Sequence, residues 1–292
     1  MIITKLIGGL GNQMFQYADG RRLAHVLGAE LKLDISEFNT YKLRTYSLGN
    51  FNIREKFASS EEVAALTSPT TLERIFAKVR RRQPRPPRTY IKEKHFHFDP
   101  DILNLPNDVY LDGYWQSEKY FADISGIIRR EFTVKVPWTG ENKELGEQIN
   151  SCESVSLHVR RGDYSSDPHT NKVHGCCGID YYLRCVEFIN SKLKHAHFFA
   201  FSDDPQWVAD NLKLPYSMTI VGHNNMSKEY EDLRLIGQCK HHIIANSSFS
   251  WWGAWLNPRE DKIVFAPKQW FGNEEQASRK MDDLFPDGWI LL

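Results

Sequence analysis

The stretch "IITKLIGGLGNQMFQYADGRRLAHVLGAELKLD", residues 2–34, decides the fold class. Its first seven residues form a short apolar run that predicts a β-strand, and the glycines that follow mark a turn. Apolar residues then recur at helical spacing from Met14 until Gly28 ends the pattern, and the alternating residues 29–34 predict a second strand. A strand, a helix and a strand in this order are typical of a parallel sheet.

The same parts return in the second half of the chain. Three further strands, each running into a polar turn, and then a helix are predicted at 154–159, 195–204, 241–248 and 249–256. Strands that alternate with helical stretches favour parallel sheets covered by helices on both faces. We therefore expect an α/β protein with two Rossmann-like domains, residues 1–140 and 141–292, which face each other across a cleft.

Composition excludes several classes of partner. The 292 residues hold 37 Lys and Arg against 37 Asp and Glu, so no global field favours nucleic acid. The chain opens without a charged leader, and its apolar runs are far shorter than the ~20 residues of a bilayer span. Five cysteines without disulfide spacing indicate a reducing compartment. The sequence thus predicts a cytoplasmic protein.

One segment departs from the balanced charge. Residues 74–94 hold nine basic residues, one acidic residue and three prolines. A solvated helix end and loop would account for this composition. The alternative is peripheral contact with the anionic inner face of a membrane, or with a lipid-linked phosphate.

Four polar clusters follow predicted strands: "GGLGNQ", "HVRRGDY", "FSDD" and "ANSSFS". Parallel sheets bind ligands at the carboxyl ends of their strands, so the four clusters are the candidate site. In "HVRRGDY", His158 and Arg160 share one side of the strand, Arg161 leaves it, and Gly162 lets the chain turn. The planar guanidinium group of arginine matches the geometry of phosphate, and Asp163 is close enough to hold one of the two guanidiniums. A salt-bridged strand end would give the same pattern.

The "ANSSFS" cluster offers an anion site. Asn246, Ser247, Ser248 and Ser250 precede or open a predicted helix, whose first N–H groups and dipole favour negative charge. Simple N-capping by serine is the alternative. The tryptophans that follow have helical spacing and are expected in the core.

The "FSDD" cluster also has two interpretations. Ser202, Asp203 and Asp204 could accept hydrogen bonds from a guanine base or from ribose hydroxyls. The same residues could cap a helix that has Pro205 at its first position. Both hold if one carboxylate caps and the other binds.

The "GGLGNQ" cluster allows a rival function. Gly9, Gly11 and the later Asp34 mimic a dinucleotide fingerprint, although Met14 replaces the third glycine. This pattern would suit an NAD-dependent oxidoreductase.

Metal sites are not expected. The pair Asp99 and Asp101 lies beside a proline and reads as a turn, and "HTNKVHGCC", residues 169–177, lacks zinc-ligand spacing.

Taken together, "GGLGNQMFQYA", "GYWQSEKYF", "HVRRGDY", "FSDD" and "ANSSFSWWGAWL" resemble the α-1,2-fucosyltransferases of glycosyltransferase family 11, and most closely a bacterial member. The resemblance implies a GT-B fold and transfer of L-fucose from GDP-β-L-fucose, with inversion and without a metal or other cofactor. The implied acceptor is a terminal β-galactose of a lipopolysaccharide glycan. A non-catalytic module that binds GDP-sugar or glycan is the remaining alternative.

The resemblance also implies roles for residues of the second domain. Arg160 would contact the β-phosphate, with Arg161 and Asp163 in support, and His158 and Asp203 would hold the nucleoside. Further donor contacts are expected from Ser202, Asp204, Asn246, Ser247, Ser248, Phe249 and Ser250.

The resemblance places the acceptor in the first domain. From there Asn12, with Gly11 and Gln13, would reach over to the donor. Acceptor-side candidates are Asp34, Trp115 and Glu118. No residue stands out as the general base, although Asp19, Asp34 and Glu118 are candidates.

Overall fold

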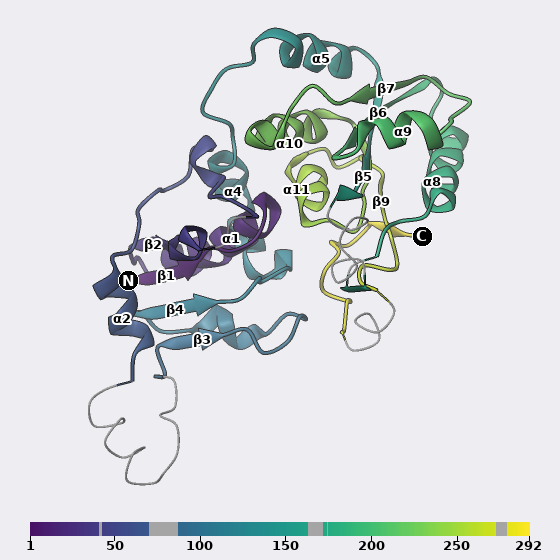
Figure 1. Cartoon of the computed structure of the whole chain (residues 1–292). Coiled ribbons are helices and arrows are strands. Elements are labelled where there is room, and N and C mark those ends of the chain that lie inside the picture. Colours follow the sequence, from purple (N-terminus) through teal and green to yellow (C-terminus); the bar gives the residue numbers. More distant parts are fainter. Residues whose placement is uncertain (41–42, 70–86, 163–171, 174, 273–278) are drawn as a thin grey trace. The chain divides into compact units, whose positions relative to one another are not determined.

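The computed structural model describes residues 1–40, 43–69, 87–162, 172–173, 175–272 and 279–292. They form two compact units, Met1–Glu131 and Phe132–Leu292, and each unit is built around its own parallel sheet (Figure 1). The α/β class that the sequence predicts is therefore confirmed. The division after Glu131 lies upstream of the predicted boundary at 140/141. The cleft, and the assignment of acceptor and donor to the two domains, stay predictions.

The first unit contains a four-stranded sheet of order β2-β1-β4-β3, in which every pairing is parallel. The strands are β1 (Ile2–Lys5), β2 (Leu31–Asp34), β3 (Tyr90–Lys92) and β4 (Val109–Asp112). The helices are α1 (Leu10–Val26), α2 (Ser60–Thr67) and α4 (Ser125–Glu131), with 3-10 turns η1 (Ser36–Asn39), η2 (Leu48–Asn50), η3 (Pro100–Asn104), η4 (Glu118–Tyr120) and η5 (Ala122–Ile124).

Helix α1 confirms the predicted βαβ unit but begins earlier than expected. It starts at Leu10, so Gly11 lies inside the helix rather than in the turn. A side chain at Gly20 would come within 3.1 Å of Leu31 and Thr4, so glycine allows the helix to lie close to the sheet. Nearly every residue of α1 is buried, including several polar ones. Their polar groups therefore need partners inside the unit.

The second unit contains a six-stranded parallel sheet of order β10-β9-β8-β5-β6-β7. The strands are β5 (Glu153–Val159), β6 (Ala196–Ser202), β7 (Met218–Val221), β8 (His241–Ile243), β9 (Val264–Ala266) and β10 (Ile290–Leu291). The helices are α5 (Gly140–Ser151), α8 (Ile179–Lys192), α9 (Pro205–Asn211), α10 (Glu229–Gln238) and α11 (Ser248–Leu256), with the turn η6 (Met226–Lys228).

The order of these strands creates a switch point. From β5 the chain builds β6 and β7 on one side, and then returns to build β8, β9 and β10 on the other. In open parallel sheets, ligands bind outside the carboxyl ends of the strands at such a reversal. The ends of β5 and β8 are therefore the expected ligand edge of this unit.

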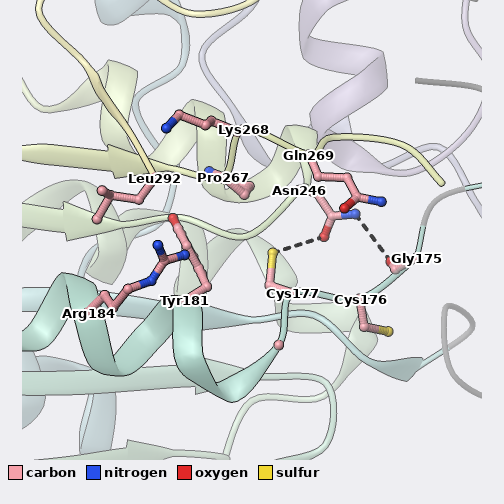
Figure 2. Close-up of a pocket in the computed structure, with 11 residues that line it drawn as sticks. Gly175, Cys176, Cys177, Tyr181, Arg184, Asn246, Pro267, Lys268, Gln269 and Leu292 are labelled. Carbon is pink, nitrogen blue, oxygen red and sulfur yellow. Dashed lines mark hydrogen bonds between the residues drawn. The ribbon is translucent and has the colours of Figure 1, made fainter. Parts of the chain in front are cut away.

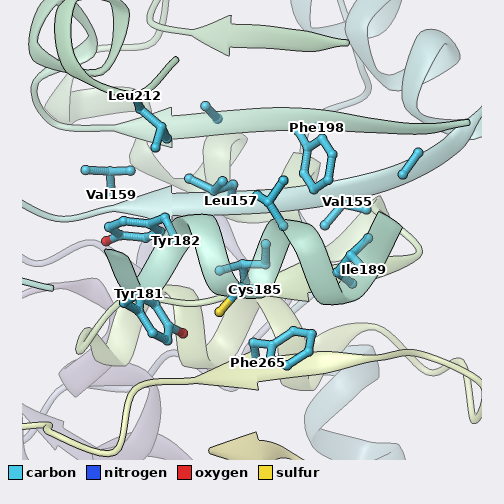
Figure 3. Packing of buried hydrophobic residues seen from close by; sticks show 14 of the residues in the cluster. Val155, Leu157, Val159, Tyr181, Tyr182, Cys185, Ile189, Phe198, Leu212 and Phe265 are labelled. Carbon is cyan, nitrogen blue, oxygen red and sulfur yellow. The ribbon is translucent and has the colours of Figure 1, made fainter. Parts of the chain in front are cut away.

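The alternation of side chains along the strands divides the core between two faces. Val155, Leu157 and Val159 of β5 pack on the face that α8 covers (Figure 3). Phe199 and Phe201 of β6 point to the opposite face, into the cluster that includes residues of α5 and α10. Burial on both faces explains the apolar run Phe198–Phe201 in β6, whereas β5 alternates apolar residues with the buried polar residues Ser154, Ser156 and His158.

Close packing of α10 against α11 generates a stability prediction. A side chain at Gly253 would place its Cβ 2.3 Å from Ile236 Cγ2, whereas a Cβ at Gly237 would meet nothing closer than 3.5 Å. We expect Gly253→Ala to lower the free energy of unfolding by roughly 1–3 kcal/mol, because overpacking outweighs better helix propensity.

Urea unfolding measures this effect, with Gly237→Ala as the matched control in the facing helix. The control should be neutral or stabilising by up to roughly 1 kcal/mol. Equal effects of the two substitutions would contradict the packing described here.

Candidate functional site

The carboxyl ends of β5 and β6 bring two predicted site segments together. Val159 and Ser202 are paired in register, so the residues that follow them are neighbours. Asp203 Oδ2 lies 2.9 Å from Arg160 Nη1, and Asp203 Oδ1 accepts a hydrogen bond from the backbone N–H of Arg161 at 2.9 Å. These three residues, Arg160, Arg161 and Asp203, are called the Asp203 clamp below.

Gly162 allows the clamp to close. A side chain there would place its Cβ 2.4 Å from Asp203 Oδ2, so only glycine admits the carboxylate at this distance. The sequence predicts that Asp163 holds a guanidinium, but Asp163 lies outside the described residues. In the structure Asp203 performs this task. The predicted contact of Asp203 with a nucleoside stays a prediction.

The two arginines have different surroundings. The Arg161 guanidinium carbon lies 4.0 Å from the ring centroid of Trp207, and Arg161 Nε lies 3.9 Å from Asp204 Oδ2. An aromatic face stabilises a cation without neutralising it. Arg160 is therefore held by a carboxylate, and Arg161 mainly by an aromatic ring.

Asp204 confirms the helix-capping interpretation of "FSDD". Its Oδ1 accepts the backbone N–H of Trp207 at 3.0 Å, with Pro205 in the first turn of α9. Ser202 Oγ donates to the carbonyl of Val159 at 2.8 Å and accepts the N–H of Asp204 at 3.0 Å. One aspartate thus caps the helix while the other holds the arginines.

His158 is buried beside the clamp. It is 5% exposed, its Nδ1 has no hydrogen-bond partner in the described part of the chain, and its ring centroid lies 5.6 Å from that of Phe249. The pKa of His158 is lowered to about 4, mainly because the ring is buried; Asp203 opposes this shift and Arg160 adds to it. His158 is therefore neutral at pH 7.

The start of α11 has no side-chain cap. Ser247 is the N-cap residue, yet its side chain accepts no hydrogen bond from the helix, and Ser250 Oγ donates to the Ser247 carbonyl at 3.3 Å. The alternative of simple N-capping by Ser247 is therefore wrong. Because α11 follows β8, its first N–H groups lie at the carboxyl edge of the sheet, where they favour an anion. Ser248 and Phe249 form this first turn.

Asn246 has a structural task beside this turn. Its Nδ2 donates to the carbonyls of Gly175 and Trp270 at 3.2 Å each, and its Oδ1 accepts from Cys177 Sγ at 3.5 Å (Figure 2). Burial raises the pKa of the Cys177 thiol to about 11, so it is protonated at pH 7. The predicted direct contact of Asn246 with the donor stays a prediction.

A cavity of about 350 Å³ lies beside Asn246, at the ends of β8 and β9 (Figure 2). Arg184 and Tyr181 of α8 line it on one side, and Lys268 and Gln269 on the other. Cations and amides at a carboxyl edge suit a polar ligand.

Gln13 holds the loop between β1 and α1, residues 6–9 and called the glycine loop below, against residues 45–47. Its Nε2 donates to the carbonyls of Gly8 and Thr45 at 2.9 Å each, and its Oε1 accepts the N–H of Ser47 at 2.9 Å. Gln13 is completely buried, so its predicted donor contact is replaced by a role in holding the loop.

Asn12 joins the glycine loop to the "GYWQSEKYF" segment. Its Oδ1 accepts from Gln116 Nε2 at 2.8 Å, which links the ends of β1 and β4. A side chain on Gly8, whose φ is +76°, would come within 2.7 Å of Asn12 Nδ2. Asn12 is therefore fixed at the carboxyl edge of this sheet, where the sequence predicts a catalytic role.

The carboxylate of Asp34 accepts hydrogen bonds from within the first unit and does not offer itself to a ribose hydroxyl group. It is 5% exposed, its Oδ2 accepts from Tyr110 Oη at 2.6 Å, and its Oδ1 accepts the N–H of Ser36 at 2.9 Å. This engagement also weakens the dinucleotide interpretation, which needs a carboxylate open to a hydroxyl group.

The other acidic candidates differ in accessibility. Burial raises the pKa of Asp19 well above its ordinary value, Glu93 adds to the shift and Arg22 opposes it. Asp19 is also 1% exposed inside α1, and a carboxyl group that the acceptor cannot reach is a poor general base. Glu118 is half-buried at the start of η4, and Trp115 lies buried just before it.

Two further observations concern classes that the sequence excludes. No three His, Cys, Asp or Glu residues in the described part of the chain gather as metal ligands. Asp99 Oδ1 accepts the N–H of Asp101 at 3.1 Å, which confirms the predicted turn.

No described helix has both the length and the apolarity to cross a membrane. Most of the basic segment, residues 70–86, lies outside the described residues.

Sequence reasoning missed Trp207, Glu93 and Gln116. Trp207 could have been found, because it stands three residues after the capping Asp204 and so lies in the first turn of α9. Gln116 lies within the quoted motif "GYWQSEKYF", which could have singled it out. Nothing in the sequence indicates that Glu93 lies at the sheet edge, because β3 is short and bears no apolar pattern.

The fold and the site define a class. Two parallel α/β units, with arginines and an uncapped helix start at a switch point, are those of a GT-B glycosyltransferase. A solved structure of a variant of Arabidopsis thaliana FUT1 in complex with GDP has a similar fold, with a TM-score of 0.50 and 13% identity. The match covers 92% of this chain and 71% of that one.

Sequence comparisons identify the family. The model described as "Glycosyl transferase family 11" matches residues 88–292. The Escherichia coli alpha-1,2-colitosyltransferase is 33% identical over 303 residues, which is 100% of this chain and 99% of that protein. The chain therefore belongs to glycosyl transferase family 11. Family membership excludes the oxidoreductase alternative.

Two further relatives are glycosyltransferases with different names. The E. coli O-antigen biosynthesis glycosyltransferase WbnK is 33% identical over 320 residues, covering 98% of this chain and 99% of that protein. A galactoside 2-alpha-L-fucosyltransferase of Caenorhabditis elegans is 26% identical over 213 residues, covering 68% of this chain and 57% of that protein.

The burial of His158 generates a pH prediction. The unfolded chain binds a proton on this histidine near pH 6.5, whereas the folded chain resists it until about pH 4. Acidification from pH 7 to 4 therefore favours the unfolded chain, by roughly 3 kcal/mol at the low end.

We expect His158→Gln to flatten the fall in unfolding free energy over this range, as measured by urea titrations at each pH. The exposed His25 serves as the control, and His25→Gln should leave the profile unchanged. Parallel profiles for wild type and His158→Gln would contradict the neutral, buried state.

Proposed function

We propose that the protein transfers L-fucose from GDP-β-L-fucose to the 2-hydroxyl of a terminal β-galactoside, with inversion and without a metal. One observation carries the proposal: the Asp203 clamp presents Arg160 at the switch point of a parallel sheet. Charge builds on the β-phosphate when GDP leaves. A fixed guanidinium is the group that can meet this charge where no cation is bound.

Three features of the second unit support the proposal. The clamp fixes Arg160 before any ligand arrives, so little reorganisation is needed in the transition state. The N–H groups at the start of α11 supply further positive potential for a diphosphate. Neutral His158 adds a hydrogen-bonding group without a charge that would repel Arg160.

The identity of the transferred sugar rests on the relatives and not on the geometry of the site. Colitose is L-fucose without the 3-hydroxyl group, and one full-length relative is a colitosyltransferase. We propose fucose because other relatives are named galactoside fucosyltransferases. The O-antigen relative supports a lipopolysaccharide glycan as the acceptor. Membrane contact through residues 74–94 remains a prediction.

The decisive assay offers GDP-fucose or GDP-colitose, together with a β-galactoside, to the purified protein in the presence of EDTA. We expect GDP release and an α-(1→2)-fucosylated product, identified by NMR, with GDP-colitose the poorer donor. GDP binding without turnover would favour the non-catalytic module instead. A product that forms only after a divalent cation is added would contradict the metal-free mechanism.

Variants of Arg160 complete this assay. Arg160→Ala should lower kcat by a factor on the order of 10²–10³, and Arg160→Lys should recover little, because an ammonium cannot replace the fork. The exposed Arg259, which pairs with Asp261, is the control, and Arg259→Ala should keep full activity. Near-normal kcat for Arg160→Lys would contradict the role given to the guanidinium.

A further inference from the structure

A second cavity, of about 170 Å³, lies within the first unit. It runs along the edge strand β3 and past its carboxyl end. Figure 1 shows β3 beside β4 in this sheet. The glycine loop follows β1 at the same edge of the same sheet and leads into the first turn of α1, which contains Asn12. The cavity therefore occupies an edge where parallel sheets bind ligands.

The walls of the cavity combine an aromatic floor with a polar rim. Trp115 and Tyr120, each 1% exposed, form the floor, with ring centroids 5.8 Å apart and planes at 84°. Glu93, Asp99 and Asp101 contribute carboxylates. An apolar base with a few placed acceptors suits a ligand that has one apolar face and several hydroxyl groups.

The cavity is built on a strained but firmly held turn. Trp115 has a φ of +54°, an unfavourable value for a bulky side chain. Glu93 holds it there, because its carboxylate accepts the N–H groups of Tyr114 at 2.8 Å and Trp115 at 3.0 Å. A side chain on Gly113 would lie 2.5 Å from Glu93 Cβ, so glycine is needed for this approach. Strain that is fixed in this way is typical of binding sites.

The floor and the rim are also joined to each other, and the floor retains one unsatisfied donor. Tyr120 Oη accepts the N–H of Asp99 at 2.9 Å, which ties the aspartate turn to the hydroxyl group of this ring. The buried indole Nε1 of Trp115 has no hydrogen-bond partner in the described part of the chain. Buried donors are normally satisfied, and a ligand oxygen would satisfy this one.

The distance from the glycine loop indicates which sugar fits. In the order β1-β4-β3, two interstrand spacings, about 10 Å, separate β1 from β3. If the hydroxyl group of the acceptor that receives the sugar lies near Asn12, the terminal galactose is held there. The cavity is then too distant for that galactose and lies where the next sugar of the acceptor glycan would be. The rim combines the carboxylates of Glu93, Asp99 and Asp101 with the ammonium groups of Lys92 and Lys94 and the imidazole of His95. This balance of charges favours a neutral ligand over a phosphate.

We infer that this cavity binds one neutral pyranose of the acceptor glycan, the sugar to which the terminal galactose is attached. Its apolar face lies on the floor of Trp115 and Tyr120, and its hydroxyl groups donate to the carboxylates of Asp99 and Asp101. The inference rests on the proposed function and assigns the choice between acceptor disaccharides to this subsite.

The test compares methyl β-galactoside with a panel of β-galactosyl disaccharides. Asp101→Ala removes an exposed rim carboxylate, and Trp115→Phe removes the indole N–H while keeping an aromatic ring. For each variant we expect kcat/KM to fall about tenfold on the best disaccharide, because a charge-assisted or buried hydrogen bond is lost. It should change less than about twofold on the monosaccharide, and the KM for the donor should not change.

Glu61→Ala, which removes an exposed carboxylate on α2 outside the cavity, is the matched control and should behave as wild type. Thermal unfolding checks that Trp115→Phe is folded, and Asp101→Ala avoids that risk because its side chain is exposed. An equal loss on both acceptors, or no loss on the disaccharide, would overturn the inference.

Failure of the proposed function would be distinguishable. If the wild type transfers no sugar to any acceptor, the proposed function fails, and the subsite is tested by titrating the disaccharides into the protein and observing saturation-transfer NMR. Binding that Asp101→Ala weakens about tenfold supports the subsite. Absence of binding, or equal binding by wild type and variant, overturns it.

Discussion

The bond between Asp203 and Arg160 is the interaction on which the site depends. It joins the ends of two neighbouring strands, β5 and β6, and it turns a flexible arginine into a fixed one. The carboxylate reaches this position only because Gly162 has no side chain. The same aspartate also orders the backbone of Arg161. A single carboxylate therefore fixes the guanidinium of Arg160 and the backbone from which Arg161 extends.

The two units use their polar residues in different ways. In the first unit, most polar side chains near the glycine loop make hydrogen bonds within the unit. Gln13 binds the loop, and Asp34 accepts a hydrogen bond from Tyr110. In the second unit, the side chain of Ser247 does not cap α11, and the Nδ1 of His158 has no partner in the described part of the chain. This contrast supports a charged ligand in the second unit and a neutral one in the first, as expected for a nucleotide-sugar and a glycan.

The sequence was sufficient for the α/β class and for the strand ends at which polar residues gather. The period-2 and helical patterns predict the βαβ unit and the parallel sheets, and strand ends predict which polar residues gather. It was not sufficient for pairings between distant segments. The sequence predicts that Asp163 holds one of the two guanidiniums, whereas the carboxylate that binds Arg160 is Asp203, at the end of a different strand. Local spacing cannot show which strands become neighbours, and therefore it cannot assign such a pair.

The most direct test of this account is amide hydrogen exchange of the whole protein with and without GDP, in EDTA. We expect GDP to slow exchange in peptides that contain Arg160–Gly162 and Ser247–Ser250, at the ends of β5 and β8. The peptides of the second cavity, around Asp99 and Trp115, should remain unchanged. Protection confined to the glycine loop around Gly9, with none at Arg160, would contradict the claim that the Asp203 clamp binds the diphosphate.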